Sequence, residues 1–102
     1  MTFVFQPPHY ESGPYAAWGR ANAPSGTADS FWVSDEFDGP VRWNIKNTAT
    51  DGWRWSLVTN AETRTTQLFR RPNHLYVGKR EDGTKLDRIL VTNDPGFSPH
   101  DP

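Results

Sequence analysis

Tryptophan side chains beside polar loops are the features of this 102-residue sequence best suited to binding chemistry. An indole face stacks on the apolar C–H face of a sugar ring, while Asn, Asp or Arg side chains hydrogen-bond the hydroxyl groups around its rim. Five tryptophans are too many for all of them to be assigned to one small core. Trp53 is the strongest candidate for an exposed ring, because it follows a polar loop at residues 46–52, and Trp43 is ambiguous. The other three lie in apolar strand patterns and are predicted core residues: Trp18, Trp32 and Trp55.

Metal and catalytic motifs are weak by comparison. The three histidines, at positions 9, 74 and 100, have no ligand spacing that would indicate zinc. The acidic run at residues 35–38 does not match a twelve-residue calcium loop and is interpreted as a solvated turn. Carboxylates are plentiful, but the sequence identifies no pair placed across a glycosidic bond, and it contains no nucleophile elbow or phosphate-binding loop. The sequence therefore does not predict an enzyme.

Alternating apolar and polar residues predict the strands that would position these side chains. Within residues 15–21, Trp18 is predicted to face the core, with small residues on the opposite face. Residues 74–92 are predicted to form a hairpin, because Asp82 and Gly83 supply turn chemistry between two strands. The second of these strands is apolar on both faces, which places it inside a sandwich. The predicted strands are residues 2–6, 15–21, 30–34, 41–45, 53–58, 65–69 and the two halves of 74–92.

Composition indicates a single all-β domain at residues 1–93, followed by a Pro-rich tail at 94–102. Nine prolines and eight glycines favour many turns over long helices. The net charge is −1 with both signs interspersed, so nucleic acid is not a predicted partner, and no apolar run approaches the length of a membrane span. The first ten residues lack the positive start and long apolar region of a signal peptide.

Four motifs in this sequence resemble those of a known family. They are YAAWGR at residues 15–20, DSFWV at 29–33, DGWRW at 51–55 and HLYVGKREDGTKLDRI at 74–89. In this order they resemble the carbohydrate-binding modules related to families 6 and 35, which are attached to agarases, xylanases and similar secreted enzymes. The last motif also resembles the C-terminal domain of some glucuronidases. The resemblance spans residues 3–92 and implies a galactose-binding-like jelly-roll β-sandwich of about eight short antiparallel strands.

The resemblance also implies a function and its residues. It implies an extracellular, non-catalytic module that binds a polysaccharide or oligosaccharide, with Trp53 stacking on the sugar and Asn93 bonding its hydroxyls. Asp51 is a weaker candidate, and Trp43 stays ambiguous. Many relatives hold one structural calcium ion with an aspartate of the last strand, which Asp87 matches, although the acidic N-terminal strand that completes this site is not found here.

This sequence begins at the strand that follows the family's first one. We therefore expect either an open sheet edge, through which the protein would form a homodimer, or an edge that the short N-terminus or the Pro-rich tail covers. The alternative function is a structural or protein-interaction domain that keeps the jelly-roll scaffold without its sugar site.

Overall fold

The computed structural model describes residues 1–5, 14–23, 30–36, 39–45, 52–70, 74–80, 83–94 and 96–99. Within these ranges the chain forms ten β-strands and no helix. The strands are β1 (Thr2–Val4), β2 (Pro14–Asn22), β3 (Ser30–Ser34), β4 (Val41–Asn44), β5 (Arg54–Leu57), β6 (Thr59–Asn60), β7 (Thr65–Thr66), β8 (Phe69–Arg70), β9 (His74–Lys79) and β10 (Lys85–Thr92).

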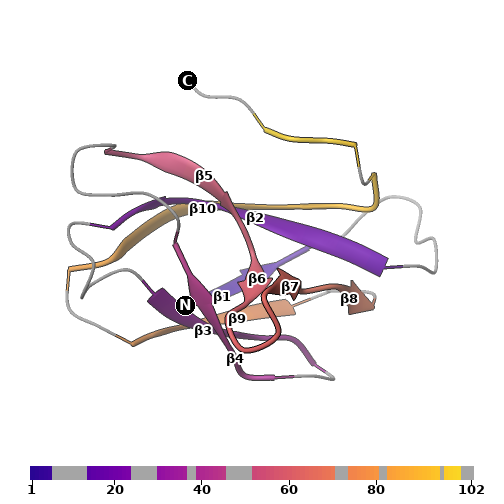
Figure 1. Cartoon of the computed structure of the whole chain (residues 1–102), viewed down its shortest axis with the longest axis horizontal. Coiled ribbons are helices and arrows are strands. Elements are labelled where there is room, and N and C mark those ends of the chain that lie inside the picture. The colour runs from indigo at the N-terminus through magenta and orange to yellow at the C-terminus, as the bar shows by residue number, and fades with distance from the viewer. Residues whose placement is uncertain are drawn as a thin grey trace.

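Two antiparallel sheets form the two layers of a β-sandwich (Figure 1). Sheet I has the strand order β1-β9-β3-β4, and sheet II has the order β10-β2-β5, with β8 pairing the start of β2. The short strands β6 and β7 pair with each other as a small hairpin beside β4. The pairs β2–β10 and β3–β9 are nested along the chain and alternate between the sheets, as in a jelly roll. The predicted all-β sandwich is therefore confirmed.

The core lies between the two sheets and is centred on Trp43 of β4, which is fully buried. Its ring stacks on Phe31 with the centroids 5.6 Å apart, and its Nε1–H donates to the Leu57 carbonyl oxygen at 3.0 Å. The buried indole therefore has its one polar group satisfied, which a buried tryptophan requires. Sheet I also contributes Val33 from β3 and Leu75 and Val77 from β9.

The faces of β2 are the reverse of those predicted. Tyr15, Ala17 and Gly19 face the core, whereas Trp18 lies half-buried on the outer face of sheet II. A Cβ built on Gly19 would lie 2.3 Å from Cη2 of Trp43, so the glycine provides the space that the large ring occupies. The small residues of β2 thus allow a close approach, which a side chain of the opposite sheet makes.

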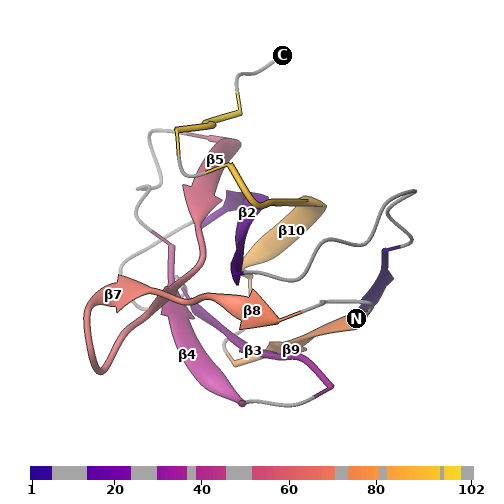
Figure 2. The same ribbon diagram turned by 90° about the vertical axis from the view of Figure 1, so that its right-hand side faces the viewer.

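Residues 74–92 do not form the predicted hairpin. The two strands are present at nearly the predicted positions, but β9 pairs with β1 and β3 in sheet I, whereas β10 pairs with β2 in sheet II. The two successive strands β9 and β10 therefore belong to different layers of the sandwich (Figure 2). Local turn chemistry predicts a change of direction, but it does not determine which strand becomes the partner.

Among the strands that the structure describes, β10 lies at the edge of sheet II and not in its interior. Its register against β2 shifts between Leu86 and Arg88, so Asp87 is the extra residue of a β-bulge. The bulge changes the alternation, and Leu86 consequently packs on the core together with Ile89 and Val91. A strict period of two would have placed Leu86 with Leu90 on the other face.

Candidate functional site

The outer face of sheet II presents a row of aromatic and charged side chains. Cross-strand neighbours point to the same face of a sheet, so the registers of β2 with β5 and β10 define this row. Trp18 pairs with Leu57 and Leu90, and Arg20 pairs with Trp55 and Arg88. Because Trp43 fills the opposite face of β2, these side chains lie on the side away from the core.

At one end of this face lies a groove of about 310 Å³, with the half-buried Trp18 among its lining residues. The groove is bounded by β2 and β5 on one side and by the segment after β10 on another. Its lining residues are Pro14, Ala16, Trp18, Leu57, Thr66, Leu68, Thr92, Asn93, Asp94 and Phe97. Rings and aliphatic side chains thus form most of the surface, and an amide and a carboxylate lie among them. This combination suits a ligand with both apolar faces and hydroxyl groups.

A turn at Asp94 brings Phe97 to the groove. The Asp94 carboxylate accepts a hydrogen bond from the Gly96 N–H at 2.9 Å, and the Phe97 N–H donates to the Asp94 carbonyl oxygen at 3.2 Å. The Asp94 N–H in turn donates to Oγ1 of Thr92 at 3.0 Å. These local bonds fold the chain back after β10, and Phe97 remains 40% exposed while lining the groove. In Figure 1, the yellow segment that follows β10 accordingly lies above sheet II.

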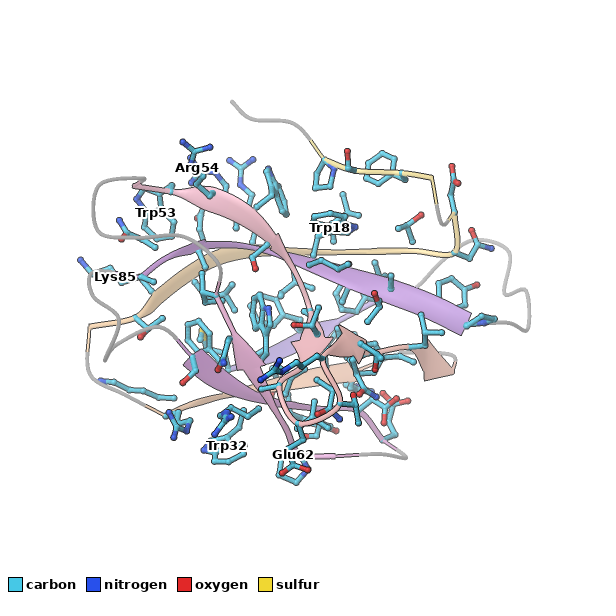
Figure 3. All side chains as sticks on the ribbon, viewed as in Figure 1. Trp18, Trp32, Trp53, Arg54, Glu62 and Lys85 are labelled. Atoms are coloured by element: carbon cyan, nitrogen blue, oxygen red, sulfur yellow. The ribbon has the colours of Figure 1, made fainter. Side chains whose placement is uncertain are left out.

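Trp53 lies at the other end of the same face, directly before β5 (Figure 3). It is 36% exposed, and the Arg20 guanidinium lies over its ring at 5.4 Å from the centroid. Arg20 also forms an ion pair with Asp87 at 2.9 Å, and the Arg88 Nε lies 3.5 Å from the same carboxylate oxygen. One face of the indole is therefore in a cation–π contact that is itself held by an ion pair.

The structure does not bring Trp53 and Asn93 together. Arg54, next to Trp53, is opposite Ala21, whereas Thr92, next to Asn93, is opposite Ala16. At about 3.3 Å per strand residue, the two backbones lie on the order of 20 Å apart, at opposite ends of sheet II. Asn93 instead lines the groove to which Trp18 also contributes. Asp51, the weaker candidate, lies outside the described residues.

The structure also places two other tryptophans, Trp43, which the sequence leaves ambiguous, and Trp32, which it predicts to be a core residue. Trp43 has no exposed surface, so its ring cannot stack on a sugar, and it leaves the set of binding candidates. Trp32, predicted to be a core residue, is 41% exposed on the outer face of sheet I, on the far side of the molecule from Trp53 in Figure 3. The Arg80 guanidinium lies 5.7 Å from its ring centroid and donates to Oγ of Ser30 at 2.9 Å.

Sequence reasoning missed the two rings that line the groove, Trp18 and Phe97. Trp18 was assigned to the core because its neighbours alternate regularly, and alternation gives two faces without saying which one is buried. The small residues on the other face of β2 were a usable signal, since they leave room for a large ring from across the core. Phe97 lies in the predicted tail, where the Asp-x-Gly sequence at residues 94–96 was the available sign of an Asx turn.

Asp87 is positioned by charge pairing and not by a cluster of acidic side chains. Its side chain is 40% exposed, and its partners are Arg20 and Arg88. An ion pair with this exposure contributes only about 0.2–1 kcal/mol. Among the described residues, no three His, Asp or Glu side chains come together in a way that could hold a metal ion.

Comparisons with known proteins identify no family for the chain. No protein-family model matches it, and neither a curated protein nor a solved structure was found to be similar. What is established is an all-β protein of antiparallel sheets, and the resemblance to carbohydrate-binding modules remains a hypothesis. Within the described part of the chain, no helix is long and apolar enough to cross a membrane.

Proposed function

We propose that this protein is a non-catalytic carbohydrate-binding module whose site is the groove beside Trp18. The observation that supports this most directly is the composition of the groove, in which Trp18 and Phe97 occur together with the polar side chains of Asn93 and Asp94. Sugar rings need both an apolar surface for their C–H faces and hydrogen-bonding groups for their hydroxyls. An extended glycan would continue along β2 toward Trp53, which would be a second contact on the same face.

The groove is partly open to solvent, so the expected affinity is low. Little surface is buried against a single sugar, and ordering the ligand costs free energy. We expect a Kd of roughly 0.1–1 mM for a matching oligosaccharide, which corresponds to about 4–5.5 kcal/mol. The glycans to screen are agar, xylan and uronic-acid oligosaccharides.

The test is calorimetric titration of these oligosaccharides into the wild type and matched variants. Trp18→Ala is expected to weaken binding at least about 10-fold, or ~1.4 kcal/mol, because it removes the main stacking surface. Asn93→Ala and Phe97→Ala are expected to weaken it severalfold, and these exposed positions should leave the fold intact by circular dichroism. Trp32→Ala, on the opposite side of the molecule, is the control and should bind like the wild type.

The possible results separate the two ends of sheet II. Equal binding by the wild type and by folded Trp18→Ala and Phe97→Ala would contradict a site in the groove. If Trp53→Ala alone loses binding, the site lies at the Arg20 end of the face instead. If the wild type binds none of a broad glycan panel, the carbohydrate proposal fails.

A second candidate function, self-association, is favoured by the edge of sheet II. Among the described strands, none pairs with the outer edge of β10, which is eight residues long. Charged side chains and a bulge protect its first half, at Lys85, Asp87 and Arg88, but residues 89–92 are uncharged. A second copy of the chain could add its own β10 there in an antiparallel arrangement.

We expect the mass measured by light scattering to rise toward that of a dimer as the protein concentration increases. Leu90→Lys should return it to the monomer mass, since a charge on an edge strand opposes pairing. Val4→Lys places the same charge on an exposed valine of sheet I and should leave association unchanged. A monomer mass at every concentration would eliminate the dimer.

A further inference from the structure

A second pocket, of about 330 Å³, lies between β4 and the β6–β7 hairpin and shares no lining residue with the groove beside Trp18. Figure 1 shows the hairpin next to β4, in agreement with the contacts between β4 and β6. The pocket is lined almost entirely by polar side chains: Arg42, Asn44, Thr59, Asn60, Ala61 and Arg64. None of these lining residues is acidic, so no carboxylate of the lining neutralises the guanidinium groups of Arg42 and Arg64.

The alternation of β4 supplies one wall of this pocket. Trp43 and Ile45 are buried in the core, so the intervening Arg42 and Asn44 belong to the other face of the strand. The Ala61 N–H donates to the Arg42 carbonyl oxygen at 2.8 Å, which attaches the hairpin to β4. This bond holds the hairpin, which forms the second wall of the pocket, at a fixed position relative to β4.

The turn of the hairpin supplies the second wall. Oδ1 of Asn60 accepts hydrogen bonds from the N–H groups of Glu62 at 2.9 Å and Thr63 at 3.4 Å, and the Arg64 N–H donates to the Asn60 carbonyl oxygen at 2.7 Å. These bonds hold Arg64 with φ at 60°, in the left-handed region that a long side chain rarely adopts. Non-glycine residues in such strained conformations cluster at binding sites, where the strain serves to position the side chain for its ligand.

Arg42 provides a further indication of a ligand. Its Nε is buried and has no hydrogen-bond partner among the described residues. A buried donor without an acceptor is costly, and the cost is greater for a charged group. An acceptor that enters the pocket would remove this cost.

We propose that this pocket binds an oxyanion: a carboxylate, sulfate or phosphate group. A guanidinium presents its N–H groups in a planar fork that matches such oxygens, and two of them neutralise a single or double negative charge. The amide groups of Asn44 and Asn60 and the hydroxyl of Thr59 add donors for the remaining oxygens. The proposal stands independently of the groove, and an acidic polysaccharide would be one source of the group.

The experiment is an NMR titration of the whole chain with sulfate, phosphate and glucuronate, each at constant ionic strength. We expect saturable shifts of the Arg42 Nε–H and of the backbone amides at 59–64. Arg64→Gly is the decisive variant, because glycine adopts a positive φ without strain while the charge is lost. It is expected to melt at the same temperature as the wild type or higher, and to bind at least fivefold more weakly. Arg88→Gln, on β10, is the control and should bind normally.

Each outcome has a definite meaning. Saturation by all three anions supports a pocket for the oxyanion group itself, and saturation by glucuronate alone supports an acidic sugar as its source. Shifts that grow in proportion to the anion concentration without saturating would show only non-specific contact and would overturn the proposal. Equal affinity of Arg64→Gly and the wild type would overturn it as well. None of these results depends on whether Trp18 binds a glycan.

Discussion

Replacing Trp43 with alanine is expected to lower the free energy of unfolding by about 3–5 kcal/mol, the range for deleting a large aromatic side chain from a core. The ring is fully buried, stacks on Phe31 and fills the space above Gly19. Its loss would leave a cavity between the sheets and would also leave the Leu57 carbonyl oxygen without the donor it now has. Since small domains are stabilised by only about 5–15 kcal/mol in total, the variant is expected to be partly unfolded at 37 °C.

Urea denaturation followed by tryptophan fluorescence and circular dichroism measures this difference. Trp53→Ala is a matched control, because it removes the same side chain from an exposed position. It should cost no more than about 1 kcal/mol, the worth of its cation–π contact with Arg20. If both variants lose the same stability, Trp43 is not the centre of the core.

Gly19→Ala should destabilise the protein by about 1–3 kcal/mol although it adds only one methyl group. The added Cβ would lie 2.3 Å from the Trp43 ring, closer than any real contact, and 3.1 Å from Cδ1 of Leu86. The ring also stacks on Phe31, and its Nε1–H is bonded to the Leu57 carbonyl oxygen, so it cannot simply move away. Gly78→Ala is the matched control within a strand, because its added Cβ would meet Trp32 at an ordinary 3.6 Å.

A double-mutant cycle isolates the contact between Gly19 and Trp43. Trp43→Phe removes the part of the ring that would collide with the new methyl group, so the cost of Gly19→Ala should be much smaller in that background. Additive costs in the double variant would mean that the glycine is required for another reason.

The strands could be predicted from the sequence because alternation is a local property. β3 begins and ends where expected, and β2, β4 and β9 differ by only a residue or two. Which face of β2 is buried could not be predicted in this way, because that depends on Trp43, which reaches across from the other sheet. The bulge at Asp87 has a similar effect on β10, where one extra residue moves Leu86 to the core face while Leu90 stays on the outer face.

The types of residue at the candidate site could be predicted from the sequence, but their positions relative to one another could not. An exposed Trp53 and an asparagine after the last strand are predicted from the sequence, and both features are present. Their arrangement depends on which strand ends meet, and that is a property of the topology. β10 runs antiparallel to β2, and so does β5, so the end of β10 and the start of β5 lie at opposite ends of sheet II.

The position of β9 in sheet I constrains the order in which this protein assembles. Among the described strands, β1 has β9 as its only neighbour, and β3 reaches β1 only through β9. Sheet I therefore cannot be completed until residues 74–79 have been synthesised, although its strands at residues 2–4 and 30–34 are made earlier. On a ribosome, the early strands would emerge with an open, apolar face, and such non-local pairing makes folding slow and exposes intermediates to aggregation. Because of this nested topology, whether β1 and β3 fold or aggregate depends on β9, which is synthesised much later.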